Sequence, residues 1–115
     1  MKRSFRDYVE DILTSFQETQ EFTQGFDFEA FARDRRTVNA VVRSLEVMGE
    51  AAKRIPAEIR KKYPEIPWKR MTGMRDKLIH EYSGVDVEIV WGVVKTELPS
   101  LKPFFARILQ DLEKP

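Results

Sequence analysis

The order of hydrophobic and polar residues along the chain predicts a protein built from helices. In the first segment, apolar side chains recur every three or four residues, which is the spacing of one buried helix face. Ser4 can cap this helix at its start, and the helix is expected to end near Gly25. We interpret its apolar residues as core and not as an aromatic box for a ligand. They are Phe5, Tyr8, Val9, Ile12, Leu13 and Phe16.

A longer helix is predicted from about Asp34 to Ile55, after a short helical segment, Phe28 to Arg33, that Asp27 can cap. The long helix stops before Pro56 because proline disrupts a helix interior. Gly49 lies in its middle, where glycine costs about 1 kcal/mol relative to alanine. A close crossing with another helix would account for that cost. The apolar stripe of the long helix contains Val38, Val41, Val42, Leu45, Met48, Ala52 and Ile55.

Prolines divide the next part of the chain. The sequence predicts a short helix, Ala57 to Lys62, and an irregular connector around Pro64 to Trp68, with Tyr63 and Trp68 anchoring it on the core. A further helix is expected from about Pro67 to Tyr82, ending near Ser83 and Gly84.

The last part of the chain is also expected to be helical. Asp86 can cap one helix with Val87, Val90, Val94 and Trp91 facing inward, and Pro99 is expected to start a separate final helix. We therefore predict an all-α protein, an up-and-down bundle of four to five main helices that forms a single domain over residues 1–115.

Composition agrees with a globular protein. The chain is 42% hydrophobic and 34% charged, and it has no apolar run of the roughly 20 residues that span a bilayer. With no cysteine and no leader-like segment, we expect a cytoplasmic protein. The net charge of +1 hides an asymmetry, because residues 33–77 carry 13 basic and 6 acidic side chains. This basic middle indicates a surface for phosphates or for an acidic partner, or a solvated helix face.

Candidate chemistry centres on the single histidine, His80. On a regular helix, Asp76 lies four residues before it on the same face and could accept a hydrogen bond from the imidazole. The end of the helix would favour the protonated ring. Arg75 lies about 140° away around that helix. The side chains of Arg75 and His80 therefore meet only if the arginine extends far around the helix or if one of the two residues comes from a second chain. Met71, Met74, Leu78 and Ile79 form the other face, which we expect to be buried.

The opposite side of the long helix carries a row of mixed charge: Arg43, Glu46, Glu50 and Lys53. These side chains could pair with one another in solvent. Alternatively, the row orients the motif side chains or crosses a dimer interface. The sequence has no cysteine, no second histidine, no acidic cluster and no glycine-rich phosphate loop, so it implies neither a metal nor a cofactor.

Four segments resemble one family in order along the chain. They are Asp34 to Ile55, Pro64 to Trp68, Arg75 to Tyr82 with its Arg, four residues, His, one residue, Tyr pattern, and Gly84 to Trp91. Together they resemble the HepT-like toxins of the HEPN/MNT (HepT/MntA) type VII toxin–antitoxin family. The resemblance implies a helical HEPN fold, a homodimer and a metal-independent endoribonuclease with Arg75 and His80 as the catalytic pair.

The same resemblance implies roles for the neighbouring residues. Asp76 would support the catalytic pair, and Tyr82 would accept AMP from a separate MNT nucleotidyltransferase antitoxin. The chemistry of cleavage also favours a dimer. It needs one group as base and another as acid, and one chain supplies a single histidine. Weaker candidates for contacts with RNA are Lys77, Arg70 and Arg36.

Two alternatives remain open at this stage. The chain could be a non-catalytic dimeric binding module that serves as the partner or AMP-accepting substrate of a nucleotidyltransferase. It could also be a purely structural bundle, in which case His80→Ala would change neither activity nor growth.

Overall fold

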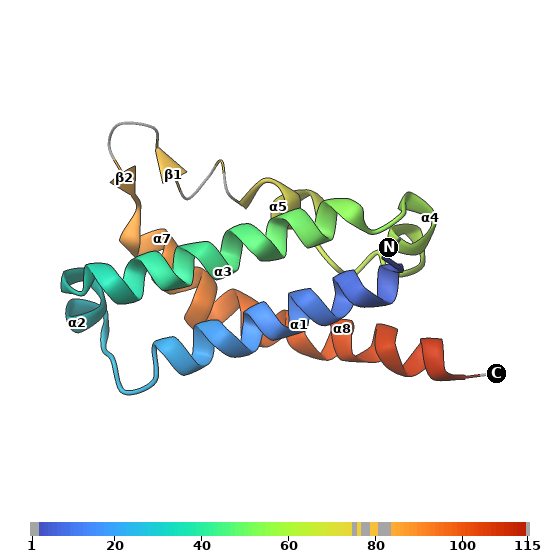
Figure 1. Ribbon diagram of the computed structural model, residues 1–115, viewed down its shortest axis with the longest axis horizontal. Coiled ribbons are helices and arrows are strands. Elements are labelled where there is room, and N and C mark those ends of the chain that lie inside the picture. Colours follow the sequence, from blue (N-terminus) through green and yellow to red (C-terminus); the bar gives the residue numbers. More distant parts are fainter. Residues whose placement is uncertain (1–2, 75, 77–78, 81–83, 115) are drawn as a thin grey trace.

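The computed structural model describes residues 3–74, 76, 79–80 and 84–114, and these residues form a mostly helical bundle (Figure 1). The predicted all-α class is confirmed, with one short two-stranded hairpin added. The elements in chain order are α1 (Phe5–Phe22), α2 (Phe28–Arg33), α3 (Arg35–Arg54), α4 (Ala57–Lys62), α5 (Trp68–Thr72), β1 (Ile79–His80), β2 (Gly84–Val85), α7 (Val87–Gly92), the π-helical η1 (Val93–Glu97) and α8 (Leu98–Glu113).

The long helices α1, α3 and α8 lie side by side along the long axis of the molecule, which measures 48 × 29 × 29 Å (Figure 1). Every residue of the predicted apolar stripe of α3 is buried. In α1, Val9, Ile12 and Phe16 are fully buried, and the ring of Phe16 meets Phe105 of α8 edge to face at 5.5 Å. One core therefore joins the three long helices.

The helix starts predicted at Ser4, Asp27, Asp34 and Asp86 are confirmed, and each depends on a local contact. Asp27, Asp34 and Asp86 each accept a hydrogen bond from the backbone N–H three residues later, at 2.8, 3.0 and 3.2 Å. Ser4 forms a capping box with Asp7 at the start of α1.

The prediction that Pro99 starts a separate helix is wrong, because α7, η1 and α8 follow one another with helical backbone at each junction. In the π-helical segment the N–H of Leu98 bonds to the carbonyl of Val93, five residues earlier. Continuing this pattern would pair Val94 with residue 99, but proline has no N–H. The side-chain amide of Gln20 in α1 donates to the Val94 carbonyl instead, at 2.7 Å.

The prediction of one helix from Pro67 to Tyr82 is also wrong. α5 ends at Thr72, and the backbone of Ile79 and His80 is a strand whose antiparallel partner is β2. Gly84 in β2 has φ of +84°, a conformation that favours glycine and interrupts any helix.

The connector before α5 is held as expected. The hydroxyl of Tyr63 donates to Asp111 at 2.7 Å, and the indole N–H of Trp68 donates to the carbonyl of Tyr63 at 3.1 Å. The Trp68 ring also meets Phe105 edge to face at 5.5 Å. In the described part of the chain, no helix has the length and apolar content to cross a membrane.

Candidate functional site

The predicted motif falls in the segment between α5 and β2. Arg75, Lys77 and Tyr82 lie outside the described residues, and His80 is described by its backbone alone. That backbone pairs with Gly84 in the β1–β2 hairpin. Asp76 is exposed and is the one motif side chain that the structure places.

The strand at His80 changes the argument that linked it to Asp76. A spacing of four residues brings two side chains together on a helix, but His80 lies in β1. The negative end of a helix dipole was also expected to favour the protonated imidazole, and this argument no longer applies because His80 lies in a strand. The roles assigned to Asp76 and His80 stay predictions, but helical spacing no longer supports their contact.

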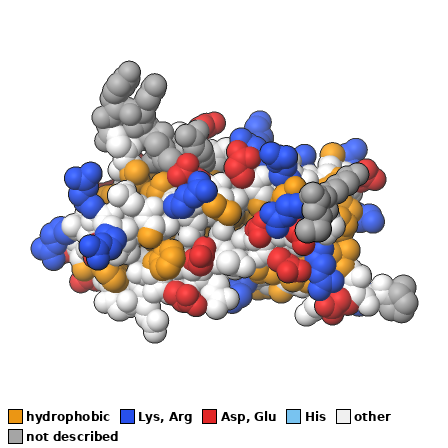
Figure 2. All heavy atoms as spheres, viewed as in Figure 1, with side chains coloured by type: hydrophobic (Ala, Val, Ile, Leu, Met, Phe, Trp, Pro, Cys, Tyr) orange, Lys and Arg blue, Asp and Glu red, His pale blue; other side chains and the backbone are white. Residues whose placement is uncertain are grey.

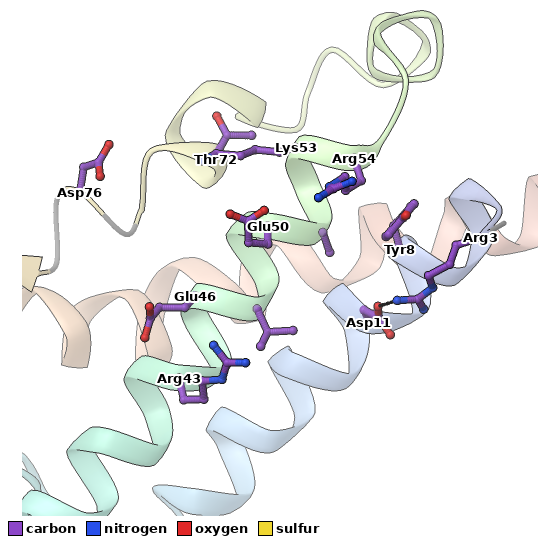
Figure 3. A pocket seen from close by; sticks show the side chains of 12 residues that line it. Arg3, Tyr8, Asp11, Arg43, Glu46, Glu50, Lys53, Arg54, Thr72 and Asp76 are labelled. Carbon is purple, nitrogen blue, oxygen red and sulfur yellow. Dashed lines mark ion pairs between the residues drawn. The ribbon is translucent and has the colours of Figure 1, made fainter. Parts of the chain in front are cut away.

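A groove of about 610 Å³ lies beside the motif segment (Figure 3). Asp76 and Thr72 line it at the motif side, α3 forms its floor, and Tyr8 and Asp11 of α1 line the other side. The row of mixed charge predicted on α3, Arg43, Glu46, Glu50 and Lys53, lines this groove, with Glu50 projecting from α3 toward the α5 side (Figure 3). The charged face of α3 and the motif segment therefore border the same space.

Charged groups in the groove are organised differently on its two sides. Near α1, Arg3 pairs with Asp11 at 2.9 Å, and its guanidinium carbon lies 5.0 Å from the centre of the Tyr8 ring. The hydrogen bond from Arg3 to Asp11 raises the pKa of the guanidinium above its ordinary value. Arg3 therefore stays charged at any working pH.

On α3, by contrast, basic side chains lie without acidic partners. Within the described residues, Arg43, Lys53 and Arg54 form no ion pair. The expected mutual pairing of Arg43 and Lys53 with carboxylates of the same row is thus not formed. Acidic and basic side chains alternate over the middle of the surface seen in Figure 2, whereas Lys and Arg side chains gather over α2 and the start of α3.

The short helix α5 and Met74, which precede the motif, pack against the core. Met71 is fully buried and Met74 is 2% exposed. A β-carbon on Gly49 would lie 3.2 Å from the Met71 carbonyl oxygen, so the close helix crossing predicted at Gly49 is confirmed. Glycine in α3 is what allows α5 to approach this closely.

Of the weaker RNA-binding candidates, Arg70 already has a partner. Its Nε donates to Glu97 of η1 at 2.6 Å, and this hydrogen bond raises the pKa of Arg70 above its ordinary value. Arg36 is exposed in the first turn of α3. Neither residue lines the groove beside Asp76.

Sequence reasoning missed several residues of the groove. Arg54 lies eleven residues after Arg43, three turns along the same helix face, and this spacing could have indicated it. Tyr8 was assigned to the core, and it does pack there in part. Its contact with Arg3 depends on the path of the chain before α1, which periodicity does not describe. Among the described residues, no cluster of carboxylate, histidine or cysteine side chains suits a metal ion.

Comparisons with known proteins agree with the resemblance. The model of the family described as Ribonuclease HepT-like matches residues 12–108. A Thermococcus cleftensis protein named "Probable ribonuclease HepT" is 50% identical over 94% of this chain and 98% of its own length. A Methanocaldococcus jannaschii protein named "Putative RNase" is 47% identical over 98% of this chain and 97% of its own length. No solved structure matches the chain significantly.

Proposed function

Because the chain belongs to the Ribonuclease HepT-like family, we propose that it is a toxin-type, metal-independent endoribonuclease with Arg75 and His80 as its catalytic pair. One observation carries the proposal: the family match over residues 12–108 includes the whole motif from Arg75 to Tyr82. The relatives named as ribonucleases, which match almost end to end, support the same activity.

The chemistry of RNA cleavage assigns a role to each side chain. A base removes the proton of the 2′-hydroxyl, whose oxygen attacks the neighbouring phosphorus, while an acid protonates the departing 5′-oxygen. The products are a 2′,3′-cyclic phosphate and a 5′-hydroxyl. His80 suits either proton transfer, since its ordinary pKa is about 6.5. The planar guanidinium of Arg75 suits the charge that develops on phosphorus.

Two proton transfers call for two groups, and the chain contains one histidine. A symmetric homodimer that brings two motifs to one cleft supplies both, one from each copy. The paired strands β1 and β2, which carry His80, stand away from the long helices, and a cleft between two copies needs the motif at such a position (Figure 1).

The direct test is cleavage of bulk cellular RNA in EDTA by wild type and His80→Ala, with mass spectrometry showing that Tyr82 is unmodified. We expect the wild type to cut in EDTA and the variant to lose cleavage by at least a hundredfold, the scale of one acid–base group. If neither protein cuts RNA, the chain is better explained as the non-catalytic binding module.

The proposal extends to control by a separate MNT nucleotidyltransferase antitoxin. Its reaction joins the phenolic oxygen of Tyr82 to the α-phosphorus of ATP, with pyrophosphate leaving. The added phosphate and nucleotide, so close in sequence to Arg75 and His80, would block RNA by charge and bulk. Tyr82→Phe should keep cleavage but escape modification when incubated with the antitoxin and labelled ATP. Label that persists on the variant would assign the acceptor to another residue.

A further inference from the structure

A second hollow, of about 480 Å³, lies between α4 and α5. Arg60, Lys61 and Lys69 line it, with Ala57 and Trp68 as its apolar part. Thr72 also lines this hollow, and it lines the groove beside the motif as well. The last residue of α5 therefore borders both spaces.

The charges around this hollow have one sign. Among the described residues, its lining includes three basic side chains and no carboxylate, unlike the groove beside Asp76. Across the part of the chain that the structure describes, none of these three residues forms an ion pair. Like charges this close repel one another, and a bound anion relieves that repulsion.

Arg60 adds a second, independent observation. Its Nε is buried and has no hydrogen-bond acceptor among the described residues. Buried donors are nearly always paired, so an isolated one calls for an acceptor. A phosphate oxygen suits a guanidinium better than any neutral group does.

The aromatic side chain in the hollow is held rigidly. Trp68 donates its indole N–H to Tyr63 and packs on Phe105, so its half-buried ring keeps one orientation beside Lys61 and Lys69. Cations interleaved with a fixed aromatic surface are typical of sites that bind single-stranded nucleic acid.

We infer that this hollow binds a backbone phosphate of the RNA strand, a short distance from the bond that is cut. The inference rests on the proposed ribonuclease function and names a substrate contact for it. Lys69 is six residues from Arg75, so at most about 20 Å of extended chain separates the two positions. The strand would leave the motif, pass Thr72 and reach the basic residues of α4 and α5.

The test uses Lys61→Gln/Lys69→Gln, which removes two exposed charges and leaves Arg60 and the packing of Trp68 in place. Arg33→Gln/Lys102→Gln, at exposed positions of α2 and α8 outside the hollow that form no ion pair with another described residue, removes the same charge as a matched control. Both pairs are made in His80→Ala protein so that RNA is bound without being cut. Binding is measured by fluorescence anisotropy with single-stranded RNA of 2 to 12 nucleotides over a range of salt concentrations.

We expect affinity of the parent protein to rise once the RNA is long enough to reach the hollow. This gain should be absent from Lys61→Gln/Lys69→Gln, and the magnitude of the slope of log affinity against log salt should fall by about 0.7, the contribution of one single-strand phosphate contact. The control pair should keep both the gain and the slope. Equal behaviour of the two double variants would overturn the inference.

Two further outcomes distinguish the phosphate site from a dimer interface and from the ribonuclease proposal itself. If sedimentation shows that only Lys61→Gln/Lys69→Gln dissociates a dimer, the hollow belongs to an interface between copies and the inference fails. Cleavage by wild-type protein is measured in parallel. Cleavage without the length effect leaves the ribonuclease standing and rejects the phosphate site, whereas the length effect without cleavage supports the site and rejects the ribonuclease.

Discussion

The two walls of the groove beside the motif are built in different ways. One wall is α3 packed on α1, helices of 20 and 18 residues; the apolar stripe of α3 is buried along its length, and α1 buries Val9, Ile12 and Phe16. The other wall is lined by Thr72 and Asp76, in the part of the chain that begins with the five-residue helix α5 and continues to the two-residue strands β1 and β2. Its described anchors are Met71, Met74, the ring of Trp68 and the pair formed by Arg70 and Glu97.

This difference indicates that the two walls have different roles. Burial along α1 and α3 stabilises the bundle as a whole, since the hydrophobic effect grows with the apolar area removed from water. The helix α5 has five residues, of which Met71 is buried, and short elements with little buried area open at lower free energy than the core. Changes in the two walls should therefore have different consequences, and the following substitutions test that expectation.

The largest effect is expected from Leu45→Ala in the wall formed by α3. Leu45 is 1% exposed, and removing such a side chain costs about 2–5 kcal/mol of unfolding free energy. RNA cleavage by the folded fraction at low temperature should be nearly unchanged. Urea unfolding and cleavage assays measure the two quantities, with Thr14→Ala on the exposed face of α1 as control. A specific loss of cleavage rate would mean that the two walls are not independent.

Gly49→Val alters the close contact between α3 and α5, where the two walls meet. Its β-carbon would lie 3.2 Å from the Met71 carbonyl oxygen, so α5 must shift, at about 1–3 kcal/mol for overpacking. Cleavage should fall more than stability predicts, because α5 carries the motif segment. Gly92→Ala is the control: nothing lies within 4 Å of its β-carbon, and alanine should stabilise a helix there by about 0.5–1 kcal/mol. Normal cleavage by Gly49→Val would show that the motif does not depend on this contact.

Tyr63→Phe loosens the connector that leads into α5. Losing the 2.7 Å hydrogen bond to Asp111 should cost about 1 kcal/mol. Burial, and then that hydrogen bond, raise the pKa of Tyr63 above its ordinary value, so the folded state holds the phenolic proton more tightly than the unfolded state. The stabilisation is complete below a pH of about 10, the pKa of an unfolded tyrosine, and is lost as the pH rises through the folded value.

Unfolding of wild type and Tyr63→Phe in urea at pH 8 and pH 11 checks this prediction. The stability difference between the two proteins should shrink at the higher pH. A difference that stays constant would mean that the hydroxyl contributes through packing alone.

The smallest change in stability is expected at the pair between Arg70 and Glu97. Both side chains are about one-third exposed, at 36% and 34%, and pairs of this kind contribute at most about 1 kcal/mol. Glu97→Gln should nevertheless lower kcat, because this pair ties α5 to η1. The exchange Arg70→Glu/Glu97→Arg should restore part of the loss, and a double-mutant cycle on kcat measures the coupling. Arg6→Gln, which breaks exposed pairs far from α5, should leave kcat unchanged.

Local signals determined much of this protein. Caps at Ser4, Asp27, Asp34 and Asp86 act within three residues of the chain, and the apolar stripe of α3 follows from helical periodicity alone. These features need no knowledge of distant residues. The histidine motif was likewise visible in the sequence, although the structure leaves most of its side chains undescribed.

Tertiary structure decided the two places where helices were predicted incorrectly. Helical backbone crosses Pro99 because Gln20, far away in sequence, donates to the carbonyl that the proline leaves unpaired. The helix expected through His80 gives way to a strand because Gly84 offers that backbone a partner. The hollow at Arg60 and Lys69 also arises only because the fold brings residues of α4 and α5 to one surface. Sequence alone determined which segments form helices, since caps and periodicity are short-range, whereas contacts between distant segments decided where helices stop, where they continue and which charges share a surface.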